Sequence, residues 1–162
     1  IQLAIITRSM QSDFCAWFPL AKPAVWASVL SIIDDRDPLE TCGDAAMYVV
    51  LTEILLDRLR DDPNGEKIFR AIHGPLGTNS TFLHFLQSAR CFTKGKTCPK
   101  HPGNAFEVFA GALASFESLT ALKSWITLSF EPLIEAAIKA WKVFEKYVYL
   151  SLSIFCSFVY MD

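Results

Sequence analysis

The chain has 162 residues, of which 52% are hydrophobic and 20% are charged, so it is long and apolar enough to bury the core of one domain. This composition excludes an intrinsically disordered chain. The formal net charge of −2 excludes a surface that is basic throughout, so any contact with nucleic acid would need a local basic patch.

The first 22 residues are predicted to form an N-terminal extension. Residues 1–6 are apolar, but this stretch is too short and too poorly flanked to be a signal peptide. Because the sequence starts with Ile1 and not with Met, we expect it to be a fragment of a longer product.

Two helices are predicted at the start of the domain. Apolar residues recur at helical spacing over residues 23–33, and an acidic cluster that includes Asp37 ends this helix. Pro38 then fits the first turn of the next helix. This second pattern, residues 38–60, is the longest of the chain and is apolar on most of its faces. Such a helix must be buried, and a second copy of the chain is one way to bury it.

Turn signals divide the middle of the chain. The sequence "DDPNGE" predicts a turn, and residues 67–72 predict a short helix that the Gly and Pro residues of 74–77 should interrupt. Thr78 or Ser80 is placed to cap a further helix, which continues through "TFLHFLQSARCF".

The last part of the chain predicts two more helices and an apolar tail. The helices span residues 104–116 and 119–144, with a break expected near Pro132. The tail, residues 147–162, is shorter than the about 20 residues of a membrane-spanning helix. A truncated membrane anchor and a strand-like buried segment are alternatives, but we expect the tail to pack on the domain or to be partly disordered, without membrane association. No strand periodicity persists, so the predicted fold class is all-α, with the domain at residues 23–146.

Five cysteines are scattered along the chain, and reduced thiols of an intracellular protein are their simplest explanation. Cys91, Cys98 and His101 fall close together in the sequence. A fourth zinc ligand is missing, however, and the spacing is not that of a usual zinc knuckle.

Acidic residues stand at unusual places in two predicted helices. Glu40 and Asp44 are four residues apart, so a helix presents both carboxylates on one face, where they repel. Glu107 stands among apolar residues, with Asn104 three positions earlier on the same face. Two helices that each offer a pair of oxygen ligands could hold one hard cation such as Mg²⁺. Alternatively, Glu40 and Asp44 complement the helix dipole and Glu107 faces solvent.

Three segments, in order, resemble the ribonuclease III family. The segment "PLETCGDAAMYVVLTEILLDRL" is similar to the signature helix of the family, "GPLGTNSTFLHFLQSARCF" to the segment that follows, and "GNAFEVFAGALASFESLTALKSWITLSFEPLIE" to the second acidic helix. The similarity covers residues 23–135, most of the chain. It implies a helical endonuclease domain that forms a homodimer and cuts double-stranded RNA with Mg²⁺, or with Mn²⁺ in its place.

The resemblance assigns roles to the acids. It implies that Glu40, Asp44 and Glu107 are catalytic residues and metal ligands, and that Asp37 is an auxiliary acid one turn before Glu40. The fourth metal position is Asn104, where the family has aspartate. This difference keeps an oxygen ligand but removes a charge, so metal affinity should fall and activity should be reduced or lost.

A basic loop precedes the second acidic helix. Residues 90–103 contain Lys94, Lys96 and Lys100 and no acid. A basic loop is ordinarily just solvated. In a ribonuclease III-like domain the three lysines could instead meet RNA phosphates near the cleft, through a contact that depends strongly on salt.

Two functions therefore compete. The first is an endoribonuclease that cleaves RNA duplexes with Mg²⁺, its activity weakened by Asn104. The second is a degenerate domain kept for RNA binding or assembly, as in ribosome-associated relatives of the family. The three retained acids favour the first function. Asn104, the altered segment 73–77 and the lack of an RNA-binding domain after Glu135 favour the second.

Overall fold

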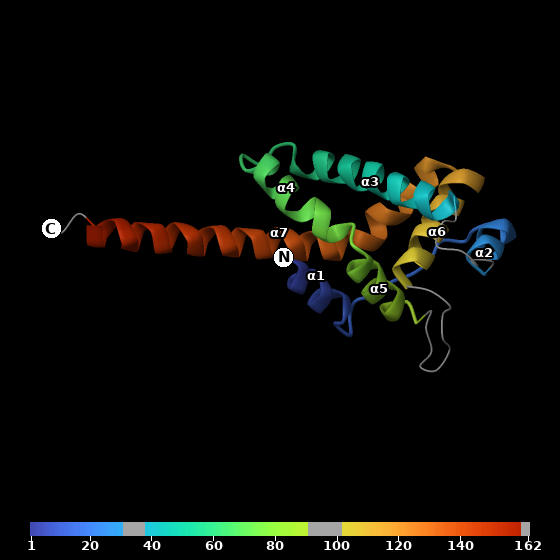
Figure 1. Cartoon of the computed structure of the whole chain (residues 1–162), viewed down its shortest axis with the longest axis horizontal. Coiled ribbons are helices and arrows are strands. Elements are labelled where there is room, and N and C mark those ends of the chain that lie inside the picture. Colours follow the sequence, from blue (N-terminus) through green and yellow to red (C-terminus); the bar gives the residue numbers. More distant parts are fainter. Residues whose placement is uncertain (31–37, 91–101, 160–162) are drawn as a thin grey trace.

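The computed structural model describes residues 1–30, 38–90 and 102–159, the side chains of residue 30 and of residues 149–159 excepted. These residues form seven helices and no strand, which confirms the all-α prediction (Figure 1). In chain order the helices are α1 (Gln2–Ser9), α2 (Pro23–Leu30), α3 (Pro38–Leu59), α4 (Gly65–Leu76), α5 (Asn79–Ser88), α6 (Pro102–Phe116) and α7 (Leu119–Val159).

Helix α3 is the long helix that the sequence predicts. It begins at Pro38, whose missing N–H would be unpaired in a first turn in any case. One face of α3 enters the core, whereas Tyr48, Val49 and Leu56 on other faces are 63%, 42% and 57% exposed. The expectation of an almost wholly buried helix is therefore wrong for the single chain. The core residues of α3 are Ala46, Met47, Val50, Leu51, Ile54, Leu55 and Leu59.

Helix α4 corrects the expected interruption at Gly74 and Pro75. The helix continues through both residues and ends at Leu76. Pro75 has no backbone N–H to bond to the carbonyl four residues earlier, but the helix continues for only one residue beyond it. The backbone N–H of Gly77 still bonds to the carbonyl oxygen of His73, at 3.3 Å, and closes the last turn.

Thr78, one of the two predicted caps, is the residue that caps α5. Its hydroxyl oxygen accepts a hydrogen bond from the backbone N–H of Thr81 at 3.3 Å. Helix α5 ends at Ser88, earlier than expected. Arg90 follows with a φ of 55°, a left-handed conformation that is typical of residues just past a helix end.

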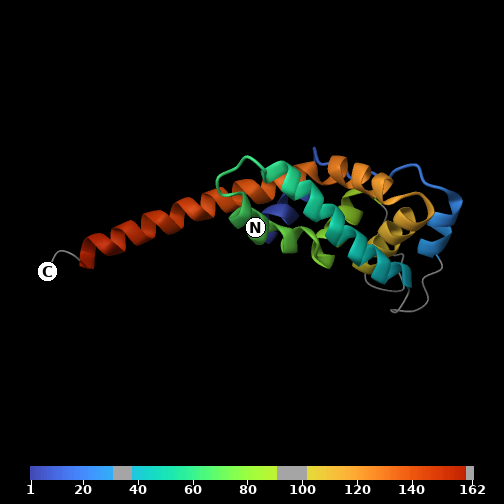
Figure 2. The ribbon, with the colours of Figure 1, turned by 90° about the horizontal axis from the view of Figure 1, so that it is seen from above.

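Helix α7 is a single helix of 41 residues. The expected break at Pro132 does not occur, and residues 147–159 of the tail continue the same helix. Figures 1 and 2 show the C-terminal part of α7 projecting away from the other helices. The chain has no further proline or glycine after Pro132 to end the helix. A search of the described residues finds no helix with the length and hydrophobicity needed to cross a membrane.

An aromatic core joins α5, α6 and α7. The rings of Phe82 and Phe106 stack with centroids 4.3 Å apart, and Phe106 also lies 5.5 Å from Trp125. The N-terminal residues take part in this core, since Ile5 is fully buried and the indole N–H of Trp125 donates to the backbone oxygen of Trp17 at 2.8 Å. Residues 1–22 thus pack closely on the helices that follow them.

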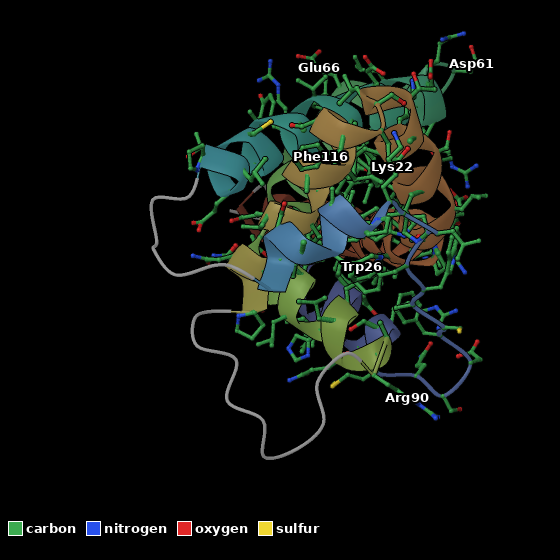
Figure 3. All side chains as sticks on the ribbon, turned by 90° about the vertical axis from the view of Figure 1, so that its right-hand side faces the viewer. Lys22, Trp26, Asp61, Glu66, Arg90 and Phe116 are labelled. Carbon is green, nitrogen blue, oxygen red and sulfur yellow. The ribbon has the colours of Figure 1, made fainter. Side chains whose placement is uncertain are left out.

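Helix α2 and the residues before it hold α6 from one side (Figure 3). The ammonium group of Lys22 donates to the carbonyl oxygen of Phe116 at 2.8 Å, where a cation complements the negative end of the α6 dipole. The ring of Trp26 lies 4.9 Å from that of Phe109. These contacts fix the orientation of α6, which carries Glu107.

Candidate functional site

Two glycines allow α3 and α6 to cross at very short range. A Cβ atom on Gly43 would overlap the carbonyl oxygen of Glu107, and a Cβ atom on Gly111 would overlap the carbonyl oxygen of Leu39. Any residue other than glycine would therefore push the helices apart. The sequence offered a signal for this crossing, since each glycine lies within four residues of a candidate acid, but only the structure pairs the two glycines.

The crossing brings the candidate acids of both helices together. Glu107 on α6 is only 8% exposed, which excludes the interpretation that it faces solvent. Asp44 on α3 is exposed and Glu40 is partly buried, and the negative charges of both act on Glu107. The two helices thus place three carboxylates in one electrostatic neighbourhood.

The ionised form of Glu107 is destabilised by its surroundings. Burial of its carboxyl group, together with the smaller effect of the negative charges of Asp44 and Glu40, raises its pKa from 4.5 to about 7. Among the ion pairs within the described part of the chain, none includes any of these three acids. A proton or a bound cation would relieve this destabilisation.

Asn104 contacts Glu40 directly. Its side-chain Nδ2 donates a hydrogen bond to Oε1 of Glu40 at 2.9 Å, across the crossing of α6 and α3. The other carboxylate oxygen of Glu40, Oε2, is buried and has no hydrogen-bond partner among the described residues. A buried acceptor without a partner is costly. This unpaired oxygen and the destabilised carboxylate of Glu107 are both groups that a bound cation would stabilise.

The carboxylates do not already converge on one point. Among the described residues, no group of three or more His, Cys, Asp or Glu side chains is arranged to hold a metal ion. Glu107 is buried and Glu40 is partly buried, whereas the side chain of Asp44 is exposed. We expect a cation bound at Oε2 of Glu40 to draw Asp44 inward.

Asn79, at the first position of α5, borders the start of α6. A Cβ atom on Gly103 would lie 2.7 Å from the Cβ and Cγ atoms of Asn79. The beginning of α5 therefore packs on the turn of α6 that precedes Asn104. Sequence spacing did not predict this contact between α5 and α6.

Several candidate residues lie outside the described part of the chain, so their predicted roles stay predictions. They are the auxiliary acid Asp37, the candidate RNA-binding residues Lys94, Lys96 and Lys100, and the zinc candidates Cys91, Cys98 and His101.

Comparisons of the chain with protein-family models, with curated protein sequences and with solved structures found no match. The molecule itself offers three acids and an amide at a close helix crossing. One of these acids has a strongly raised pKa, and another has a buried oxygen without a partner among the described residues.

Proposed function

We propose that the chain is a ribonuclease III-like endonuclease domain that cleaves double-stranded RNA with Mg²⁺ or Mn²⁺. The acid cluster at the crossing of α3 and α6, in which Glu107 is buried, carries this proposal. Burying carboxylates without a cationic partner destabilises a fold, and perturbed carboxylates that cluster in this way mark functional sites. The resemblance of the two helices to the acidic helices of that family supports the same assignment.

Each acid would have a separate task in the reaction. Glu40 would bind the cation through Oε2, the oxygen that lacks a partner among the described residues. Asp44 would complete the site from the solvent side. Glu107 must lose its proton before it can act as a ligand, so the raised pKa makes cation binding stronger as the pH rises through about 7. A bound Mg²⁺ ion supplies Lewis acidity toward the phosphodiester and activates water for the attack.

A homodimer is part of this proposal. Tyr48, Val49 and Leu56 leave apolar surface on α3, the same helix that carries Glu40 and Asp44. A second copy that packs on this surface would bury it and would place two acid clusters in one particle. Two clusters suit a substrate with two strands.

One observation favours the alternative of a degenerate domain that binds RNA or serves in assembly. The position that carries aspartate in the family is Asn104, so the site has one negative charge fewer than an aspartate would give. Its amide group also occupies one oxygen of Glu40.

Cleavage of long duplex RNA in the presence of Mg²⁺ separates the two functions. We expect the wild-type chain to cut the duplex and Glu107→Ala to be at least about 100-fold slower, a loss of about 2.7 kcal/mol of transition-state stabilisation. Glu66→Gln is the matched control, since the side chain of Glu66 is 77% exposed and forms an ion pair with Arg70 on its own helix. Asn104→Asp should cut faster than wild type.

Two results would contradict the proposal. If the wild-type chain leaves the duplex intact while Asn104→Asp cuts it, the natural chain is a degenerate scaffold. If Glu107→Ala cuts as fast as wild type, the acid cluster is not the active site.

A further inference from the structure

The bond between Asn104 and Glu40 links the two helices of the candidate site. It joins residues 64 positions apart in the sequence, at a donor–acceptor distance of 2.9 Å, in a partly buried position. A hydrogen bond from a neutral amide to a carboxylate is stronger than one between two neutral groups. The contact therefore contributes to the positioning of Glu40.

The atom of Asn104 that faces Glu40 determines whether Asn104 can be a metal ligand in this arrangement. Nδ2 is a donor, and a metal ion binds only acceptor atoms. A cation shared by Glu40 and Asn104 would require the amide oxygen on this side. In the observed arrangement the amide N–H instead donates a hydrogen bond to Oε1 of Glu40, and so stabilises part of the negative charge that a cation would otherwise neutralise.

We infer that Asn104 is a positioning residue that competes with the divalent cation for Glu40. Its amide N–H holds Oε1, so the ion either binds through Oε2 alone or displaces the amide group. This inference rests on the proposed function, because it presupposes the cation site. It replaces the expected role of Asn104 as a neutral fourth ligand. The hydrogen bond from Asn104 to Glu40 would then be the reason for a low cation affinity of the site.

The two roles of Asn104 predict opposite effects of its removal. If Asn104 is a ligand, Asn104→Ala weakens cation binding. If Asn104 is a competitor, the variant frees both oxygens of Glu40, and binding becomes tighter. We expect binding about tenfold tighter, close to the lower end of what a hydrogen bond to a charged group contributes. Asn104→Leu, which keeps the volume but has no polar atom, should act in the same direction.

Calorimetric titration of the full chain with Mn²⁺, after treatment with a chelator, tests this inference. We expect both variants to bind Mn²⁺ more tightly than wild type. In chelator the thermal unfolding midpoints of both should be lower, because Glu40 has lost its partner, and Mn²⁺ should raise these midpoints more than it raises that of wild type. Gln87→Ala, at an exposed position of α5, is the control and should bind Mn²⁺ as wild type does.

The outcomes separate the inference from the proposed function. Weaker or unchanged Mn²⁺ binding by Asn104→Ala and Asn104→Leu overturns the inference, even if the wild-type chain binds the ion and cuts RNA. If neither the wild-type chain nor any variant binds Mn²⁺, the cation site does not exist, and both the inference and the proposed function fall.

Discussion

Glu107 should make the stability of the metal-free chain fall as the pH rises. The pKa of this buried carboxyl is about 7 in the folded chain and close to 4.5 in the unfolded chain. Between these pH values the folded chain holds a proton that the unfolded chain has lost. Raising the pH through this window therefore favours unfolding, and the effect levels off above about pH 7.

The size of the effect follows from the two pKa values. The difference between 4.5 and about 7, at 1.36 kcal/mol per pKa unit, corresponds to about 3 kcal/mol. Glu107→Gln keeps the shape of the side chain and cannot ionise. The variant should therefore match wild type at about pH 4 and below, and exceed its free energy of unfolding by up to about 3 kcal/mol near pH 8.

Urea unfolding in chelator, at a series of pH values, measures this difference. Subtracting the wild-type free energy of unfolding from that of Glu107→Gln removes the contribution of titrating groups that are distant from Glu107. Glu66→Gln supplies the control, because an exposed pair between neighbouring turns contributes little and should give a difference that is small at every pH. If the Glu107→Gln difference is equally flat from pH 5 to 8, or slopes the other way, Glu107 is not the strained acid described above.

Three further substitutions test the fold by the same urea unfolding at neutral pH. Gly111→Ala should lower the free energy of unfolding by about 3 kcal/mol, because the added methyl group meets the backbone of Leu39; an unchanged value would mean that α3 and α6 do not cross closely. Thr78→Ala should cost about 1 kcal/mol through loss of the α5 cap, and no loss would place the start of α5 elsewhere. Phe144→Asp, at a position that is 64% exposed on α7, should change stability by no more than about 0.5 kcal/mol, whereas a large loss would show that Phe144 is buried in the folded chain.

Local chemistry made parts of the fold predictable. Pro38 marks the start of α3 because a proline loses nothing in a first turn, and Thr78 caps α5 because its hydroxyl can reach a free backbone N–H. Pro75 and Pro132 were misread as breaks. A proline costs one backbone bond and some steric strain, and packing on both sides of each residue offsets that cost.

The candidate site was predictable only in part, because its chemistry depends on contacts between helices that are distant in the sequence. The spacing of Glu40 and Asp44 fixes their common face within one helix, but burial of Glu107 depends on how closely a second helix approaches. That approach depends on Gly43 and Gly111, which lie far apart in the sequence. Sequence spacing also cannot show which end of the Asn104 amide faces Glu40. The chemistry of the site therefore became visible only with the crossing of α3 and α6.

The most direct test of the cation site is the dependence of cation binding on the acids of both helices. Calorimetric titration with Mn²⁺ should show binding to the wild-type chain that Glu40→Gln on α3 and Glu107→Gln on α6 each weaken by at least about tenfold, the smallest effect expected from disturbing a metal site. Glu66→Gln should bind as wild type does. If both site variants retain wild-type affinity, the acids of α3 and α6 do not form a common metal centre.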